Sequence, residues 1–194
     1  MPNTLRTGQY YSFTQENPDI TNMFAGLGWD VNRDENDVFP IDLDACAFLL
    51  GQDGRVTSAS DFIFYNNLKH PTGAVVHTGD NRTGEGEGDN EAILVDFKKL
   101  PPDIVKIVFT VSIYEAADRD QTFGSVHNAY IRIYDEELGE LFRYDLSETF
   151  SDKTAVVFGE ITLDNGEWRF HAIGEGYNGG ILALSLRYGV FKKK

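Results

Sequence analysis

The chain has 194 residues, of which 41% are hydrophobic and 13% aromatic, a composition that suits a folded domain and excludes a disordered or fibrous protein. Its 17 Lys and Arg residues stand against 31 Asp and Glu residues, for a formal net charge of -14. An acidic protein repels nucleic-acid phosphates, so we expect no nucleic-acid partner. No composition shift or linker divides the sequence, so we expect one domain over residues 1–194.

Two further features bear on where the protein works. No stretch approaches the roughly 18 apolar residues of a membrane span, and the first six residues are not followed by the apolar core of a signal peptide. We therefore expect a cytoplasmic protein. The one cysteine, Cys46, lies in the apolar run 45–50 and is predicted to be a small buried side chain rather than a reactive thiol.

Strand signals recur along the whole chain, either as strict alternation of apolar and polar residues or as runs rich in β-branched and aromatic residues. In chain order they are Tyr10–Phe13, Ile41–Ala45, Phe62–Tyr65, Ala74–His77, Ile93–Phe97, Val108–Tyr114, Ile131–Tyr134, Thr154–Leu163 and Trp168–Ile173. Turn sequences separate them, and Asp164-Asn165-Gly166 is a strong hairpin signal. The pattern predicts an all-β protein, a β-sandwich of two mainly antiparallel sheets.

One or two short helices could accompany the strands. Leu100-Pro101-Pro102-Asp103 could open a helix or form a turn before the next strand. Residues 180–188 could form a C-terminal helix packed on a sheet or a final strand, because periodicity alone does not distinguish the two.

The first acidic motif is Asp42-Leu43-Asp44. On a strand these two carboxylates point to the same face, about 7 Å apart, because side chains alternate across the sheet. Two like charges at that distance repel each other unless a positive group lies between them. A hard cation with several oxygen ligands would meet that need.

The second acidic motif spans residues 79–91 and contains four glycines among its acids. Glycine allows tight curling, which can turn carbonyl and carboxylate oxygens inward, as calcium coordination requires. An EF-hand is rejected because Glu85 occupies the position of the obligatory glycine. A phosphate cradle is rejected because Glu85, Glu87 and Asp89 would repel the phosphate. A solvated acidic hairpin is the alternative interpretation of this loop.

A series of motifs resembles the tellurium-resistance TerD family in order and spacing, over nearly the whole chain. The matching segments are 26–30 (GLGWD), 42–45 (DLDA), 60–67 (SDFIFYNN), 79–91 (GDNRTGEGEGDNE), 100–109 (LPPDIVKIVF), 113–116 (IYEA) and 123–126 (FGSV). The resemblance implies a calcium-binding β-sandwich linked to tellurite resistance and to stress responses, without established catalytic activity.

The resemblance also implies a ligand set for about two Ca²⁺ ions. The expected ligands are Asp30, Asp42, Asp44, Asn66, Asn67, Asp80, Asp89, Asn90 and Glu91, with carbonyl oxygens of the glycine-rich loop. Many relatives have aspartate where this chain has Asn90, a change that removes one negative charge and keeps an oxygen. Two bound Ca²⁺ ions would shift the net charge from -14 to -10.

Other classes of function fit the sequence less well than calcium binding. The four histidines lack zinc spacing, and no nucleophile motif is present, so we expect no enzyme. The alternative function is a calcium-dependent module that binds a membrane or a small ligand, including a cyclic nucleotide, with Lys192–Lys194 assisting at an anionic surface. A stress-response scaffold is the function that the resemblance favours, with other Ter-type proteins as partners and association with the inner membrane surface as a further expectation.

Overall fold

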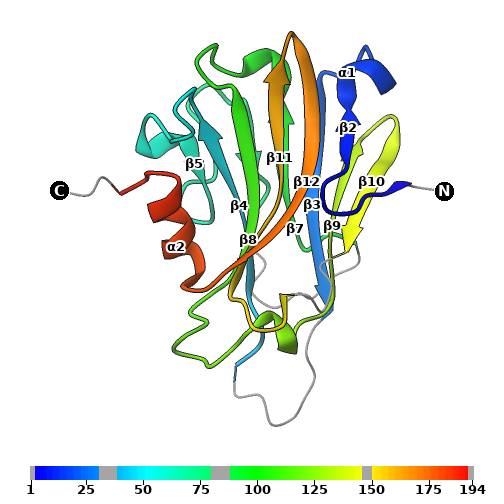
Figure 1. Ribbon diagram of the computed structural model, residues 1–194. Coiled ribbons are helices and arrows are strands. Elements are labelled where there is room, and N and C mark those ends of the chain that lie inside the picture. The colour runs from blue at the N-terminus through cyan, green and yellow to red at the C-terminus, as the bar shows by residue number, and fades with distance from the viewer. Residues whose placement is uncertain (1–2, 31–38, 80–87, 146–149, 192–194) are drawn as a thin grey trace.

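The computed structural model describes residues 3–30, 39–79, 88–145 and 150–191 and shows two six-stranded sheets packed face to face (Figure 1). Sheet A contains, in spatial order, β1 (Asn3–Thr4), β10 (Gly139–Asp145), β9 (His127–Asp135), β3 (Asn22–Asp30), β7 (Glu91–Asp96) and β6 (Val75–His77). Sheet B contains β2 (Tyr10–Ser12), β12 (Glu167–Tyr177), β11 (Ala155–Asp164), β8 (Lys106–Ile113), β4 (Leu43–Leu50) and β5 (Phe62–Ile63). All pairs are antiparallel except β1 with β10, so the predicted all-β sandwich is confirmed.

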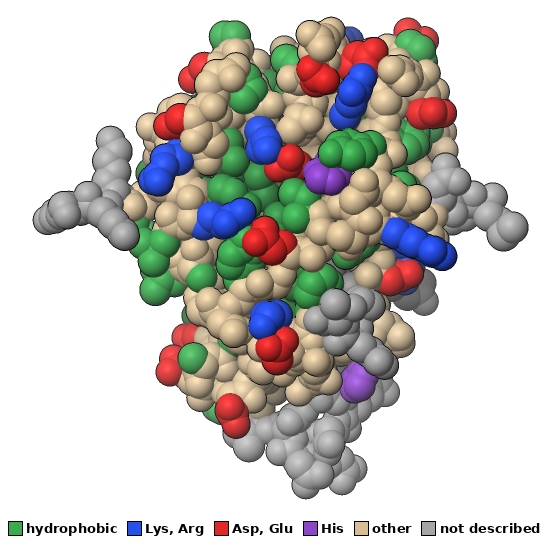
Figure 2. Space-filling view, viewed as in Figure 1, with side chains coloured by type: hydrophobic (Ala, Val, Ile, Leu, Met, Phe, Trp, Pro, Cys, Tyr) green, Lys and Arg blue, Asp and Glu red, His purple; other side chains and the backbone are tan. Residues whose placement is uncertain are grey.

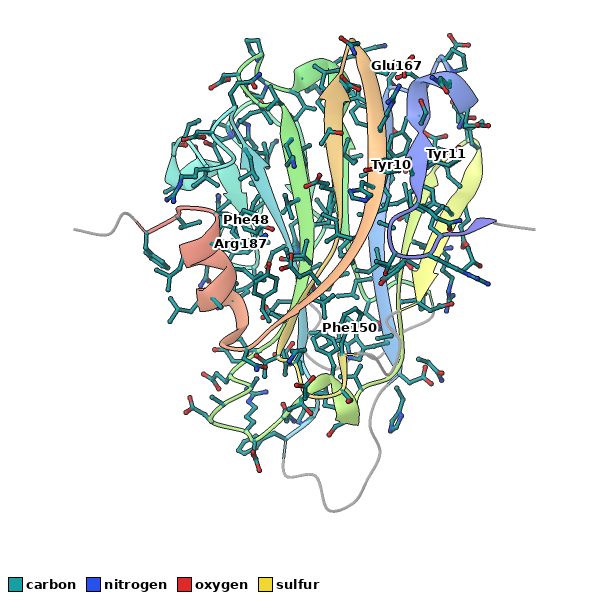
Figure 3. All side chains as sticks on the ribbon, viewed as in Figure 1. Tyr10, Tyr11, Phe48, Phe150, Glu167 and Arg187 are labelled. Atoms are coloured by element: carbon teal, nitrogen blue, oxygen red, sulfur yellow. The ribbon has the colours of Figure 1, made fainter. Side chains whose placement is uncertain are left out.

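Alternation along the central strands builds the core between the sheets. In β4, Leu43, Ala45, Ala47 and Leu49 face the interior, whereas Cys46 and Phe48 face the outside of sheet B. That outer face is not solvated, because α2 (Gly180–Arg187) covers it and packs Leu184 against a second apolar cluster (Figure 3). Cys46 is fully buried there, as predicted.

The two ambiguous segments are resolved by their local chemistry. Residues 180–187 form a helix, whose first backbone N–H groups, of Gly179 and Gly180, both donate to the hydroxyl of Thr154. Leu100–Asp103 is a turn; the short helical segment precedes it as the 3-10 turn Phe97–Lys99, where the Asp96 side chain accepts from the Lys98 N–H. Within the described residues, no helix combines the length and apolarity needed to cross a bilayer.

Several elements differ from the prediction. The strand expected at Tyr10–Phe13 ends at Ser12, because the Ser12 hydroxyl accepts from Gln15 N–H and starts the helix α1 (Phe13–Glu16). β3 and β10 were not predicted. β3 contains Gly26 and Gly28, and because glycine has a low intrinsic preference for strands, the local sequence does not indicate one here. The remaining short helices are the 3-10 turns Ala59–Asp61 and Phe123–Ser125.

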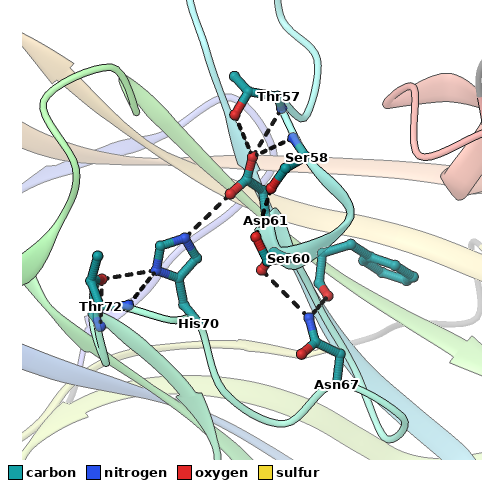
Figure 4. Close-up of polar contacts among 9 residues, drawn as sticks. Thr57, Ser58, Ser60, Asp61, Asn67, His70 and Thr72 are labelled. Atoms are coloured by element: carbon teal, nitrogen blue, oxygen red, sulfur yellow. Dashed lines mark hydrogen bonds and ion pairs between the residues drawn. The ribbon is translucent and has the colours of Figure 1, made fainter.

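A buried polar network holds the segment that joins β4 to β6 (Figure 4). One oxygen of Asp61 accepts from the backbone N–H and the hydroxyl of Thr57 at 2.9 and 2.6 Å and from Ser58 N–H at 2.8 Å. The other oxygen lies 3.2 Å from Nε2 of His70, and both residues are buried. Burial raises the pKa of Asp61, but the hydrogen bonds from Thr57, Ser58 and His70 outweigh it and hold the pKa below its ordinary value.

We expect Asp61→Asn to lower the free energy of unfolding by about 2 kcal/mol near neutral pH, because it weakens hydrogen bonds to a buried charge. A folded-state pKa below the unfolded value means that this contribution is full above the unfolded pKa of about 4 and is lost as the pH falls through the folded pKa. Urea unfolding of wild type and variant at several pH values measures the difference. A gap between the two proteins that stays constant down to the most acidic pH would contradict this assignment.

Candidate metal centre

The described acidic residues of the two motifs lie on strands that start or finish at one end of the sandwich. Asp30 ends β3, and Glu91 begins the antiparallel neighbour β7, where it pairs in register with Leu27. Asp42 lies directly before β4, which starts opposite the last residue of β8. The fold therefore brings together residues up to 61 positions apart in the sequence.

Glu91 connects the two sheets at this end. It lies in the interior-facing row of β7 with Ile93 and Val95, and it is only 2% exposed. Its Oε2 accepts a hydrogen bond of 2.7 Å from Ala45 N–H of β4 and lies 3.3 Å from Nε2 of His77 in β6. One buried carboxylate thus joins sheet A to the strand that follows Asp42 and Asp44.

His77 is a residue of this site that the sequence analysis did not single out. It is 3% exposed and lies two residues after Val75, which belongs to the interior cluster. Alternation alone therefore predicts that the imidazole faces the interior, where a polar ring needs a partner. Its Nδ1 accepts a hydrogen bond of 3.2 Å from Gly79 N–H, and its Nε2 lies beside Glu91, which the pairing of β6 with β7 brings close.

Asp42 and Asp44 point to the same face, as predicted. Their neighbours Ile41, Leu43 and Ala45 all belong to the interior cluster, so the two carboxylates lie on the outer side of sheet B. Both residues are buried, at 6% and 3% exposure. The carbonyl of Asp42 accepts from Tyr114 N–H at 2.9 Å, which continues the β4–β8 pairing beyond the strand end.

The negative charge of this region affects the pKa of the buried Cys46 thiol. Burial raises its pKa well above the ordinary value, and the charges of Asp44 and Glu91 raise it further. Two carboxylates on different sheets therefore act on the same buried position. A cation bound nearby would relieve their repulsion.

Asp89 has a different environment, on the outer face of sheet A. Its carboxylate accepts from Nε of Arg132 at 2.8 and 3.1 Å and from the Tyr130 hydroxyl at 3.2 Å. It lies directly on β3, where a Cβ on Gly26 would come within 2.1 Å of its Oδ2. Gly28 has the same role beneath the ring of Tyr130, at 2.4 Å. The two glycines of β3 thus provide the space in which Asp89 and Tyr130 lie.

The remaining predicted ligands lie in separate local environments. Asn90 accepts from Trp29 N–H through its side-chain oxygen, and Asp30 accepts from the side-chain amide of Asn128. Asn67 donates to the Phe62 carbonyl inside the β5 turn, and Asn66 is exposed in that turn. Asp80 lies outside the described residues.

The donors fit a hard cation in kind. They are carboxylate and amide oxygens, which calcium prefers, and the most buried of them lie in a region of negative charge. Among residues 3–30, 39–79, 88–145 and 150–191, no group of three His, Cys, Asp or Glu side chains is gathered closely enough to hold a metal ion. The predicted ligand set as a whole therefore stays a prediction.

The fold and this site define a two-sheet β-sandwich with acidic residues at one end. The family model of the TerD domain matches residues 1–188, so the chain belongs to the TerD family. It is 46% identical over 188 residues to the tellurium resistance protein TerD of Serratia marcescens, covering 96% of this chain and 97% of the relative. General stress protein 16U of Bacillus subtilis (strain 168) matches with the same identity and coverage, and the uncharacterized protein YceE of that organism is 51% identical over 187 residues, covering 96% and 97% of the two chains.

Solved structures share the fold. The crystal structure of a homologue of telluride resistance protein (TerD) from Streptomyces coelicolor A3(2) superposes with a TM-score of 0.73 at 20% identity, covering 86% of this chain and 95% of the other. At that identity the likeness concerns the fold alone.

Proposed function

We propose that this TerD-domain chain is a calcium-binding stress-response protein that binds about two Ca²⁺ ions at the acidic end of its sandwich and works as a binding or scaffold module rather than as an enzyme. The names of its relatives, tellurium resistance protein and general stress protein, support the physiological part of the proposal. Other stress-response proteins of the Ter type are its expected partners, in the cytoplasm.

The observation that carries the proposal is the hydrogen bond from Ala45 N–H to Glu91 Oε2. It fixes the start of β4, with Asp42 and Asp44, against the start of β7, which follows the glycine-rich acidic segment in the sequence. Carboxylates from two separate motifs thereby lie on facing strands of the two sheets, Glu91 between the sheets and Asp42 and Asp44 on the outer side of sheet B. A cation bound at this end would offset the repulsion between them.

Within this arrangement, Asp42 and Asp44 are proposed ligands whose position the sheet fixes. Both are buried, and the hydrogen bonds of strand pairing hold their backbone in place. Asp89 already faces Arg132, so we expect it to bind metal only by giving up part of that ion pair. Calcium would supply positive charge and fix the loops at this end, and a partner would recognise the ordered surface.

We expect Ca²⁺ to raise the melting temperature of chelator-stripped protein and Mg²⁺ to raise it much less. Binding to the folded state alone adds about 2.7 kcal/mol when free metal is a hundred times the dissociation constant. Magnesium demands strict octahedral geometry and retains its water, which suits a site built from several carboxylates poorly. Differential scanning calorimetry with each ion makes the comparison.

Asp42→Asn is the informative variant, because it keeps the shape of the side chain and removes its charge. It should lose most of the calcium-dependent rise in melting temperature while it still folds. Asp53→Asn, in the exposed turn after β4, serves as the control for a lost negative charge. A full calcium response in Asp42→Asn, equal to that of the control, would remove Asp42 from the ligand set.

A further inference from the structure

Beyond α2, the outer face of sheet B carries a row of side chains that crosses four strands (Figure 2). Strand register places Glu160 of β11 opposite His171 of β12, and His171 opposite Tyr10 of β2. Lys106 of β8 reaches the same carboxylate, with its Nζ 2.7 Å from Glu160 Oε2, and His171 Nδ1 lies 3.9 Å from Glu160 Oε1. Tyr10 ends the row, because β2 is the last strand of sheet B (Figure 3).

The ring of Tyr10 has a fixed orientation although it lies at the surface. It stacks on the imidazole of His171, with the ring centroids 4.2 Å apart and the planes 2° from parallel. In the adjacent pair Ala172 N–H donates to the Gln9 carbonyl, so Tyr10 and His171 form a non-hydrogen-bonded pair, in which side chains lie closest. Tyr10 is 64% exposed, the highest value among the large hydrophobic residues that the structure describes. One face of the ring therefore rests on His171, and the opposite face is open.

Tyr10 also lines a groove of about 650 Å³, a size within the roughly 300–1,000 Å³ of small-molecule sites. The groove runs along the free edge of β2, and its lining includes Gln9, Tyr10, Gln15, Glu16 and Arg169. Because hydrogen-bonded pairs alternate along an antiparallel ladder, the backbone N–H and C=O of Tyr10 face this edge rather than β12. An aromatic ring and hydrogen-bonding groups thus line the same space.

The charged residues of the groove favour a neutral ligand. Arg169 and Glu16 are the charged residues of the lining, which therefore has no net charge. Arg169 donates to Oε2 of Glu167 from Nη2 at 2.6 Å and from Nε at 3.1 Å, and its Nη1 lies 3.4 Å from Oδ2 of Asp164. An anionic ligand would have to displace these carboxylates, on a chain whose formal net charge is -14.

We propose that this groove binds the ring of a neutral sugar, stacked on the open face of Tyr10. One face of a sugar ring presents C–H groups, which pack on the electron-rich face of an aromatic ring, and its hydroxyls both donate and accept hydrogen bonds. The Gln9 side-chain oxygen accepts from Arg6 N–H at 2.7 Å, which leaves the side-chain NH2 group as a donor to the ligand. The inference is independent of the proposed calcium site, because the lining includes none of the proposed metal ligands that the structure describes.

The test is an NMR titration of the ¹⁵N-labelled full chain in EDTA with glucose, galactose, mannose and N-acetylglucosamine. At least one of these sugars should shift the amide signals of residues 10–12 and 169–171 in a saturable way. Glucose 6-phosphate as an anion and choline as a cation should shift these signals less. Tyr10→Ala should weaken sugar binding on the order of tenfold, because the contact area of the ring is lost, and Tyr10→Phe should retain most of it. Gln9→Ala should weaken binding several-fold.

Matched controls remove the same chemistry elsewhere. Phe191→Ala and Gln52→Ala change an aromatic ring and an amide at other exposed positions and should bind the sugar as wild type does. Tyr10 and Gln9 are exposed, so their variants should fold, as the melting temperature would verify. The proposal is overturned if no sugar of the set shifts these signals at millimolar concentration, if either charged probe shifts them more strongly, or if Tyr10→Ala binds as wild type does. A sugar effect that appears only with added Ca²⁺ would assign the binding to the metal centre instead.

Discussion

Replacing Glu91 with alanine should lower the free energy of unfolding by about 3–4 kcal/mol and abolish most of the calcium response. The carboxylate is 2% exposed, accepts from Ala45 N–H and lies beside Nε2 of His77. Its removal leaves a buried backbone donor and a buried imidazole without their carboxylate, and breaking one side of a buried pair is costly. The start of β4, with Asp42, also loses its connection to β7. Urea unfolding and calcium titration measure the two effects.

Glu91→Gln separates the structural role from the charge. The glutamine oxygen can still accept from Ala45 N–H, so most of the stability should return. The calcium response should stay low, because the negative charge is absent. If Glu91→Gln bound calcium as wild type does while Glu91→Ala did not, Glu91 would hold the strands together without contributing to the metal site.

Gly26→Ala should destabilise the protein by about 2 kcal/mol, although alanine is only one methyl group larger. The new Cβ would lie 2.1 Å from Oδ2 of Asp89, well inside van der Waals contact. Asp89 would have to leave the surface of β3 and give up its ion pair with Arg132, which is held at 2.8 Å. Thermal unfolding measures the loss.

Two further variants show whether Asp89 is the cause. Gly51→Ala places its Cβ no closer than 3.4 Å to its neighbours, so it should cost little. In the double variant Gly26→Ala with Asp89→Ala the obstructing carboxylate is absent, so the protein should be no less stable than Asp89→Ala alone. Additive losses in that double variant would mean that the Gly26 methyl group collides with something other than Asp89.

The sequence predicts the strands where a single local signal dominates. Alternation at 108–114 places β8 to within two residues, whereas the alternation at 41–45 locates only the beginning of β4, which runs from Leu43 to Leu50. Both strands separate an apolar interior from a distinct outer face. The same alternation does not predict β3, because Gly26 and Gly28 weaken the strand signal. These two positions are glycine because the side chains of Asp89 and Tyr130 occupy the space that a Cβ would need. Asp89 and Tyr130 are distant in sequence, and only the pairing of β3 with β7 and β9 brings them close.

The site was predictable to a similar extent. The common face of Asp42 and Asp44 follows from strand alternation, and the structure bears it out. The role of His77 and the bond from Ala45 to Glu91 depend on how sheet A meets sheet B, which no local pattern encodes. The pairing of Asp89 with Arg132 was also beyond local reasoning, because it joins residues 43 positions apart on the outer face of sheet A.

Isothermal titration of chelator-stripped protein with Ca²⁺ tests the central proposal most directly. Buried carboxylates from two motifs should bind the ion with a saturable heat and a stoichiometry near two, and Asp42→Asn should reduce that heat. Heat no larger than that of dilution, together with a melting temperature that does not change with Ca²⁺, would show that the acidic end of this sandwich is not a calcium site.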